Sequence, residues 1–340
     1  MIDIKEAKEL VIKAGHELSE TGLIARTWGN VGARTGPHSF VITASGKSYE
    51  TLTEDEVVEV DMNDLSYSGA IAPSSEMKVH REIYLARPDV DFIIHTHQEY
   101  ATAAGVMGKG HIWFDKDHGS IGPGVLCADY ALPGTKSLCK KIGVAVRNAS
   151  GNAVLMKRHG AVCYGRTYEE AFAVARDLEE GCGAYIKAAS PMLREDLDDF
   201  GEGDGSMFLT NVQKMEGTRA VMCCDKVVMD YLSMKMDLPA YIDDYAQLIG
   251  PSAPFVRNDK EEIMKAAAKY PAVLVDGEGV LCTGKNGDEI AVSMLVRKNC
   301  ISYFAASSMG KAKKLGVKDA VIMRYVYVSK YSKLEGDLQK

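Results

Sequence analysis

The chain has 340 residues, of which 46% are hydrophobic and 26% charged, and its formal net charge is -7. This length suits one large domain or two of ordinary size, and the composition is that of a globular protein with a complete hydrophobic core. The negative charge disfavours nucleic acid and anionic membranes, because both require a basic face on the protein. We therefore expect no nucleic-acid partner and no membrane partner, and an anionic substrate must be held by local donors.

The cysteines and the N-terminus indicate a reducing, cytoplasmic location. The eight cysteines lie in apolar segments without the paired spacing of a zinc ribbon or a thioredoxin site, so we interpret them as buried thiols. The N-terminal segment MIDIKEAKELVIKAGHEL carries acidic residues at helical spacing, which argues against a secretion signal. No apolar run reaches membrane-spanning length.

Helices and strands alternate along the first part of the chain. In chain order, the hydrophobic spacing and the turn residues predict a helix over 4–18, strands over 39–46 and 57–62, a serine-capped helix within 73–89, a strand over 90–98, a helix over 99–107, two strands within 152–165 and a long helix from residue 167. This mixture predicts a sheet with helices packed on it, of α/β or α+β class.

The second part of the chain contains a partial copy of the first. The acidic, glycine-rich run 194–206 is the best linker candidate. Beyond it, residues 271–304 align without gaps with residues 152–185, and glycines and cysteines fall in register. We therefore predict a first domain over 1–200 and a degenerate partial repeat over 205–340, structural or accessory. His159 of the first copy corresponds to Glu278 of the second.

Two histidines one residue apart form the first chemical signal. Side chains alternate faces along a strand, so His95 and His97 project to the same side, roughly 7 Å apart along the chain. The alternative is that both histidines are core residues whose ring nitrogens bind backbone groups. Each buried ring would then need its own hydrogen-bond partners to offset the free-energy cost of leaving water. A bound metal explains the pair more economically.

A third ligand is expected where another predicted strand ends at the same rim. His159 meets this condition, because it precedes a glycine that permits close backbone approach. Three imidazoles with an open position form a catalytic zinc arrangement. Among the other histidines we expect solvated or packing roles for His16 and His80, and we assign none to His38, His111 and His118.

Glu76 opens the helix that precedes the histidine strand. A carboxylate in a first helical turn is favoured by the helix dipole alone, so by itself it does not indicate a site. Ser74 and Ser75 stand beside it, however, and their hydroxyls with the helix N-terminus would form an anion pocket next to the metal.

Five motifs occur in the order and approximate spacing of the class II aldolase/adducin family, and the chain most resembles the sugar-phosphate aldolases of that family. The motifs are TWGNVGAR (27–34), VITASGKSYETLTEDEVVEVD (41–61), APSSEMKVHREIYLARPDVDFIIHTH (72–97), CADYALPGT (127–135) and LMKRHGAVCYG (155–165). The resemblance covers roughly residues 1–190. It implies an α/β/α sandwich and a homo-oligomer that shares site residues across its interface.

The resemblance also implies a set of site residues. A zinc ion, or another divalent ion such as Mn²⁺ or Co²⁺, would be held by His95, His97, His159 and Glu76. Glu76 would serve as the catalytic acid and base, and Tyr130 would reach a neighbouring subunit's site as a proton donor. The implied phosphate-binding residues are Asn30, Ser45, Gly46, Ser74 and Ser75.

The expected reaction is cleavage of a ketose 1-phosphate, or a related sugar phosphate, to dihydroxyacetone phosphate and an aldehyde. Breaking the carbon–carbon bond leaves negative charge that a divalent ion would stabilise. Glu76 would protonate the resulting carbanion, and for this we expect partial burial to raise its pKa towards neutrality.

Other functions of the same family remain open. Related sugar-phosphate 4-epimerases carry aspartate where this chain has Glu76, which favours the aldolase, and a decarboxylase or a dehydratase is a further alternative. A non-catalytic, adducin-like scaffold is the rival from another class, but such a protein is expected to have lost the metal ligands. Gly32 departs from the family, because many relatives carry serine there, and this difference affects the expected phosphate pocket.

Overall fold

A computed structural model of the chain describes residues 2–24, 27–194, 217–285, 287–310 and 312–331. The chain divides into two compact units, the first running from residue 1 to 185 and the second from 186 to 333. Apart from Arg194, the predicted linker lies outside the described residues, as does the predicted boundary between residues 200 and 205. Among the described residues, no helix combines the length and the apolar character that crossing a membrane requires.

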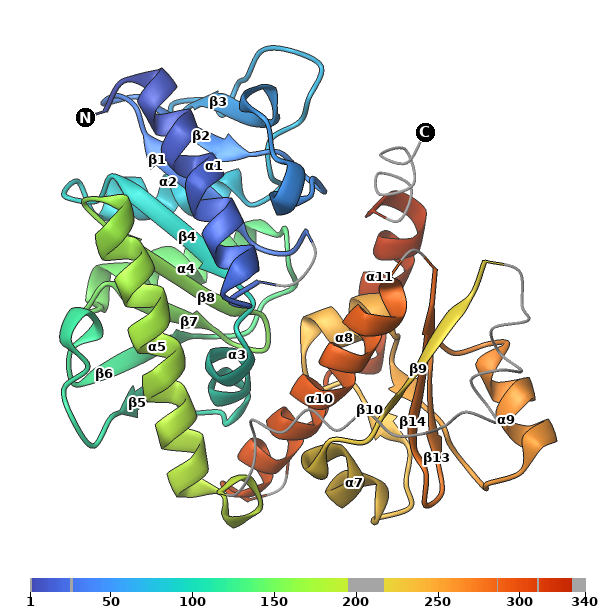
Figure 1. The fold of residues 1–340 in the computed structure, drawn as a ribbon. Helices are drawn as coiled ribbons and strands as arrows, with labels where there is room; N and C mark the ends of the chain where they lie inside the picture. The colour runs from blue at the N-terminus through green and yellow to red at the C-terminus, as the bar shows by residue number, and fades with distance from the viewer. Residues whose placement is uncertain (1, 25–26, 195–216, 286, 311, 332–340) are drawn as a thin grey trace. The chain divides into compact units, whose positions relative to one another are not determined.

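The first unit is built on a mixed eight-stranded sheet (Figure 1). Its strands are β1 (Asn30–Arg34), β2 (Ser39–Thr43), β3 (Val57–Asp61), β4 (Phe92–Thr96), β5 (His111–Trp113), β6 (Gly124–Ala128), β7 (Ala153–Met156) and β8 (Gly160–Gly165). They lie in the order β3-β2-β1-β4-β8-β7-β6-β5, and only β6 and β7 run parallel to each other. The centre of the sheet is therefore the pair β4 and β8, one carrying the predicted histidine motif and the other following His159.

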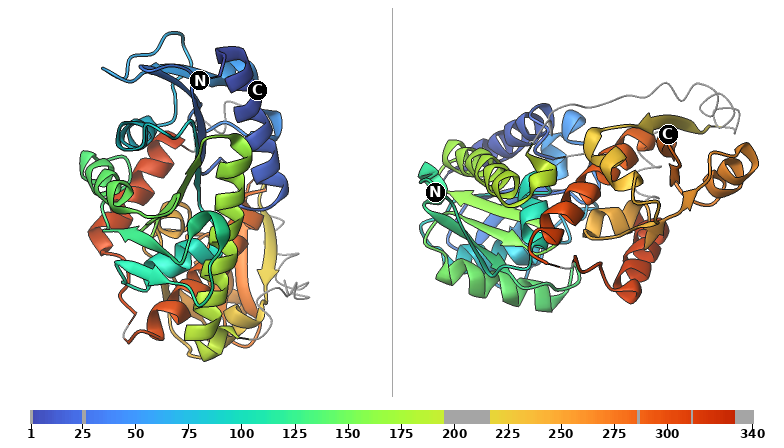
Figure 2. Two further views of the ribbon diagram at one scale, coloured as in Figure 1. Left: turned by 90° about the vertical axis from the view of Figure 1, so that its left-hand side faces the viewer. Right: turned by 90° about the horizontal axis from the view of Figure 1, so that it is seen from below.

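Helices cover both faces of this sheet (Figures 1 and 2). They are α1 (Ile4–Glu20), α2 (Met77–Ala86), α3 (Glu99–Val106), α4 (Lys136–Asn148) and α5 (Tyr168–Ala189). On one face, Ile83 of α2 and Ile142 of α4 share a buried core with Ile93 of β4. On the other face, Tyr168 of α5 packs its ring edge against Phe92 of β4. This arrangement is the expected α/β/α sandwich.

The predicted helix over 4–18 is confirmed, and its cap explains where it begins. Asp3 adopts an extended conformation and its side chain accepts a hydrogen bond from the backbone N–H of Lys5. Ala7, Val11 and Leu18 lie on one buried stripe, as expected for an amphipathic helix.

The helix predicted within 73–89 begins later than its serines indicated. It starts at Met77, and Glu76 itself is the N-cap residue. Ser74 is held instead in a turn, where its backbone N–H donates to the carbonyl of Thr43 at the end of β2. The expectation of a serine cap, with Glu76 in the first turn, was wrong because this pairing fixes the chain until residue 76.

The second unit contains a four-stranded sheet in the order β12-β13-β14-β9. Its strands are β9 (Arg219–Cys223), β12 (Phe255–Val256), β13 (Ala272–Val275) and β14 (Gly279–Gly284), and a separate pair is β10 (Leu238–Pro239) with β11 (Ser252–Ala253). The helices are α7 (Lys226–Leu232), α8 (Asp243–Leu248), α9 (Lys260–Ala267), α10 (Asp288–Ser307) and α11 (Val317–Val326). β12 and β13 run parallel and the other neighbours antiparallel, the same pattern as β6-β7-β8-β4 of the first unit.

Short turns complete the described elements. The 3-10 turns are η1 (Tyr49–Thr51), η2 (Glu54–Glu56), η3 (Gly119–Ile121) and η4 (Pro191–Leu193), and η5 (Tyr327–Tyr331) is a π-helical turn after α11.

Candidate metal centre and active site

The central strands bring the first two histidines to one rim of the sheet. His95 lies near the end of β4, His97 follows that strand directly, and Asn30 at the start of β1 is the register partner of His95. Gly29, in the left-handed region with φ +85°, lies so close to the His95 carbonyl that any Cβ would overlap it. The tight approach of β1 therefore depends on a glycine at this position.

His159 reaches the same rim from the loop between β7 and β8. Arg158 before it has φ +68°, a conformation that costs a non-glycine residue roughly 1–2 kcal/mol. A Cβ at Gly160 would overlap the carbonyl oxygen of Thr96 on the neighbouring strand. The expected close approach at Gly160 is therefore present, and it brings the loop against β4.

The three histidines and Glu76 converge. One potential ligand nitrogen from each of His95, His97 and His159 lies within 4.8 Å of the others, and this is the one such cluster found among the described residues. Glu76 Oε2 lies 3.0 Å from Nε2 of His95, and its Oε1 lies 3.1 Å from Nε2 of His159. All three histidines are buried, and the Glu76 side chain is 11% exposed.

The donor set fits a divalent cation. Nδ1 of His95 lies 2.7 Å from the carbonyl oxygen of Ala161, which can only accept, so this nitrogen carries the proton. In the neutral ring, Nε2 then presents a lone pair, and it lies 3.0 Å from Nε2 of His97 as well as 3.0 Å from Glu76. Atoms this close would repel one another unless they share a proton or a metal cation, and a backbone carbonyl that orients the ring is the usual support of a metal-binding histidine.

Glu76 does not have the raised pKa that we expected. Burial acts to raise it, but the adjacent His95 and His159 outweigh burial and hold the pKa of this carboxyl well below its usual value. The expectation considered burial without the histidines, which lie within hydrogen-bonding distance. Among these groups Glu76 is therefore an anion.

The two serine segments of the implied phosphate pocket lie side by side. Ala44 and Pro73 form a bridge, and the backbone N–H of Ser45 donates to the carbonyl of Ala72. Ser74 is buried and its Oγ accepts from the backbone N–H of Glu76, whereas Ser75 is exposed.

The remaining implied residues occupy different surroundings. Gly46 follows this bridge in the left-handed region, with φ +72°. Asn30 is buried at the rim and donates from Nδ2 to Glu76 Oε2 over 2.9 Å. Tyr130 is half-buried in the segment after β6, where its backbone carbonyl accepts from Lys141 Nζ. The structure thus groups Asn30 with the histidine cluster, while the role of Tyr130 stays a prediction.

Sequence reasoning missed two residues beside the cluster. His80, expected to be solvated or to serve in packing, is fully buried and its Nε2 lies 2.6 Å from Asn30 Oδ1. Its position four residues after Glu76 is a signal, because residues with this spacing share a helix face. The indole of Trp28 stacks on the His97 ring, with centroids 6.4 Å apart.

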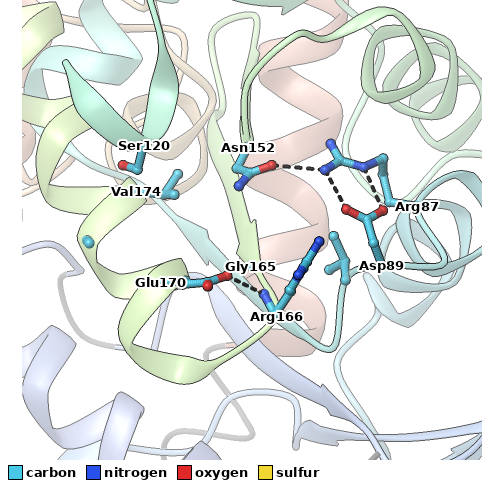
Figure 3. Close-up of a pocket in the computed structure, with 10 residues that line it drawn as sticks. Arg87, Asp89, Ser120, Asn152, Gly165, Arg166, Glu170 and Val174 are labelled. Carbon is cyan, nitrogen blue, oxygen red and sulfur yellow. Dashed lines mark hydrogen bonds and ion pairs between the residues drawn. The ribbon is translucent and has the colours of Figure 1, made fainter. Parts of the chain in front are cut away.

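A hollow of about 450 Å³ lies away from the histidines, at the opposite ends of the same strands (Figure 3). It is lined by Val90, which precedes β4, and by Gly165, the last residue of β8. Its polar side chains bind one another, since Arg87 donates to both carboxylate oxygens of Asp89 and to Oδ1 of Asn152. We assign it no function.

Known proteins match the first unit of the chain. The family described as the Class II Aldolase and Adducin N-terminal domain matches residues 9–186. L-fuculose phosphate aldolase of Escherichia coli strain K12 is 32% identical over 174 residues, which is 50% of this chain and 78% of that protein. L-fuculose phosphate aldolase of Methanococcus maripaludis is 30% identical over 169 residues, or 50% of this chain and 90% of that protein.

The solved structures agree with this assignment. The chain is similar to a structure of L-fuculose 1-phosphate aldolase with a TM-score of 0.51 and 30% identity, over 54% of this chain and 86% of that one. The family match, the sequence relatives and this fold all cover the unit that carries the three histidines and Glu76. The chain therefore belongs to the class II aldolase and adducin family.

Proposed function

We propose that the chain is a divalent-metal-dependent aldolase that cleaves a ketose 1-phosphate, or a related sugar phosphate, to dihydroxyacetone phosphate and an aldehyde. The observation that carries the proposal is the convergence of His95, His97 and His159, with Glu76 within hydrogen-bonding distance of two of them. A non-catalytic scaffold has no need of four such groups buried together, because their desolvation costs free energy.

The histidines would hold the ion, with Glu76 as a further ligand. A divalent ion bound here would stabilise the negative charge that develops on substrate oxygens when the carbon–carbon bond breaks. Zinc suits a three-imidazole set with an open position, and Mn²⁺ and Co²⁺ are the other candidates.

Glu76 would exchange the proton at the substrate carbon. Its carboxylate lies between the histidines and the buried amide of Asn30, so it is oriented from both sides. As an anion it is ready to remove a proton in the direction of condensation, and it returns that proton in the direction of cleavage. Tyr130, contributed by a neighbouring subunit of a homo-oligomer, would donate a proton to the aldehyde oxygen in condensation, and in cleavage it would take that proton back from the substrate hydroxyl that becomes the aldehyde oxygen.

The phosphate would bind beside the metal. Ser45 and Gly46 on one segment and Ser74 and Ser75 on the other are held together by the bridge between their neighbours. Hydroxyl groups in such a turn, with the side-chain amide of Asn30, would bind an anion without a cationic side chain. Fixing the phosphate would position the bond to be cleaved.

The second unit, with its predicted extent of 205–340, is in this proposal a degenerate partial repeat with a structural or accessory role. Its position equivalent to His159 is Glu278, whose carboxylate accepts a hydrogen bond from Asn258 Nδ2 over 2.6 Å. Removing the residues after 205 from the full chain tests the role. Unchanged kinetics and assembly would show that this part is dispensable.

The test of the reaction is a panel of ketose 1-phosphates, assayed for release of dihydroxyacetone phosphate. We expect activity to disappear on chelation and to return with added Zn²⁺, Mn²⁺ or Co²⁺. Cleavage that persists in chelator, or a protein that neither binds nor responds to any divalent ion, would exclude the proposal. Interconversion of pentulose 5-phosphates without cleavage would instead indicate an epimerase.

Glu76→Gln tests the proton transfer separately from metal binding. The amide keeps the size of the side chain but cannot accept the proton, so we expect the cleavage rate to fall by about 10²–10⁴-fold. Metal content should stay at the wild-type level, because the three histidines remain. Full activity in this variant would remove Glu76 from the proposed mechanism.

A further inference from the structure

A chain of hydrogen bonds runs from the interior of α2 to the candidate catalytic carboxylate. His80 Nε2 lies 2.6 Å from Oδ1 of Asn30, and Nδ2 of Asn30 donates to Oε2 of Glu76 over 2.9 Å. His80 is 0% exposed and Asn30 is 3% exposed, so water does not compete for either bond. Glu76 and His80 are four residues apart at the start of α2, and Asn30 bridges them from β1.

The carboxylate of Glu76 determines where the protons lie in this series of hydrogen bonds. A carboxylate only accepts, so the amide of Asn30 must present its NH₂ group to Glu76 and its Oδ1 to His80. Nε2 of His80 must then carry a proton. Nδ1 of His80 faces no acceptor among the described residues, so a proton there would be unpaired, and burial also lowers the pKa of His80 to about 3.

The His80 ring is held in place on several sides. Phe40 stacks on it with an interplanar angle of 14°, and Tyr84 packs on it in an edge-on arrangement. On β1, a Cβ at Gly32 would lie 2.6 Å from Nδ1 of His80 and 3.1 Å from Cε1. Only glycine leaves room for the ring. The packing of His80 therefore gives a reason for glycine at position 32, where many relatives carry serine.

This arrangement is not the most stable one for a core histidine. Nδ1 of His80 is buried and finds no hydrogen-bond partner among the described residues. An unsatisfied buried acceptor costs about 1–3 kcal/mol. A phenylalanine or leucine would fill the same space without that cost, so packing alone does not account for an imidazole here.

We propose that His80 is a positioning residue that acts on Glu76 through Asn30. Its Nε2–H fixes the orientation of the Asn30 amide. Without that bond the amide can rotate by half a turn and present Oδ1 to the carboxylate, which repels it. His80 therefore keeps Glu76 in place for the proton transfer. The effect on catalysis rests on the proposed function, whereas the hydrogen-bond chain itself does not.

Three variants test the proposal, with His38→Ala as a control that removes an exposed histidine. His80→Phe should lower kcat by about 10–100-fold, the usual effect of losing an outer-shell partner. His80→Gln should recover part of the activity, because its amide N–H can donate to Asn30. Gly32→Ala should lower kcat in the same direction, because the new methyl group displaces the ring without removing any polar group.

A second measurement uses neither activity nor metal. Nitrogen-15 NMR of the metal-free wild-type protein at neutral pH should show His80 as a neutral ring with its proton on Nε2, assigned by its loss in His80→Phe. In Asn30→Ala this proton should exchange faster with water. A neutral ring with its proton on Nδ1 would overturn the proposal, because Nε2 could then not donate to Asn30, and wild-type kcat in His80→Phe would overturn it as well.

The two proposals fail in different ways. If the wild-type protein cleaves no sugar phosphate, the proposed function fails, and the NMR measurement still decides whether the hydrogen-bond chain exists. If His80→Phe does not fold, Gly32→Ala and the wild-type spectrum decide the question.

Discussion

The β7–β8 hairpin of the first unit and the β13–β14 hairpin of the second have the same frame but different chemistry. Their registers match residue for residue over the four pairs that close each hairpin. In both loops the middle residue is left-handed, Arg158 with φ +68° and Gly277 with φ +78°. The following residue is His159 in the first unit and Glu278 in the second. One frame thus presents a candidate metal ligand in one unit and a carboxylate in the other.

The neighbouring strand extends the comparison. β4 pairs with β8, and β9 pairs with β14 in the corresponding register. When the hairpins are superimposed by sequence, Met222 falls at the position of His95 and Cys224 at that of His97. Shared topology therefore does not carry the chemistry, which depends on a few side chains at one rim. We interpret the second unit as a degenerate partial repeat on this basis.

The largest effect is expected from removing the ligand that distinguishes the hairpins. His159→Ala should abolish metal binding and lower the cleavage rate by more than the 10–100-fold that follows loss of an outer-shell partner. Elemental analysis of the dialysed protein measures the first effect, and the aldolase assay measures the second. Wild-type metal content in this variant would contradict the three-histidine site.

Adding a histidine to the second hairpin is the counterpart of the His159→Ala experiment. Glu278→His introduces the missing imidazole, but the equivalents of the other two ligands are Met222 and Cys224, so we expect the metal content per chain to stay unchanged. A second bound ion would show that the frame of β13 and β14 supplies more of the site than we infer.

Metal should stabilise the wild-type protein and leave His159→Ala unaffected. A ligand that binds only the folded state at 100 times its Kd adds about 2.7 kcal/mol. We therefore expect Zn²⁺ to raise the unfolding temperature of the wild-type protein and chelator to lower it. An equal shift in both proteins would indicate that the ion binds elsewhere.

The pH dependence of stability isolates His80, which belongs to α2 and lies outside the strands that the two units share. Its pKa is about 3 in the folded protein and near 6.5 when unfolded, so below pH 6.5 the unfolded chain binds a proton that the folded one does not. The neutral ring therefore contributes stability that is present above pH 6.5 and lost as the pH falls towards 3. Relative to His80→Phe, the metal-free wild-type protein should lose roughly 1 kcal/mol for each pH unit in this window.

Urea denaturation at several pH values measures this difference. The lowered pKa of Glu76 also removes stability as the pH falls, so both proteins are compared in a Glu76→Gln background, where this carboxylate is absent. Parallel stability curves for the two proteins would mean that His80 is protonated in the folded state.

The smallest effect concerns the left-handed position that both loops share. A Cβ at Gly277 would meet no atom within 4 Å, so Gly277→Ala should cost only the backbone conformation, about 1 kcal/mol. Gly110→Ala is the matched control, because its site is also open but its backbone is not left-handed. It should lower the free energy of unfolding by no more than about 0.3 kcal/mol. Equal stability losses in the two variants would mean that conformation is not the cause.

The sequence by itself determined the features that depend on local periodicity. Alternation along residues 92–97 placed both histidines on one face, and helical spacing predicted α1 almost to its ends. Glycine spacing identified the loop that presents His159 and its counterpart in the second unit. These features were predictable because each follows from residues only a few positions apart.

Only the tertiary structure decided how the candidate catalytic carboxylate is held. Asn30 is 46 residues from Glu76 and 50 residues from His80 in sequence, and no local pattern relates such positions. The sheet register that places β1 beside β4 brings them together. The direction of the Glu76 pKa likewise depends on histidines from two other segments, since electrostatic and hydrogen-bonding effects follow distance in space, which only the folded chain defines.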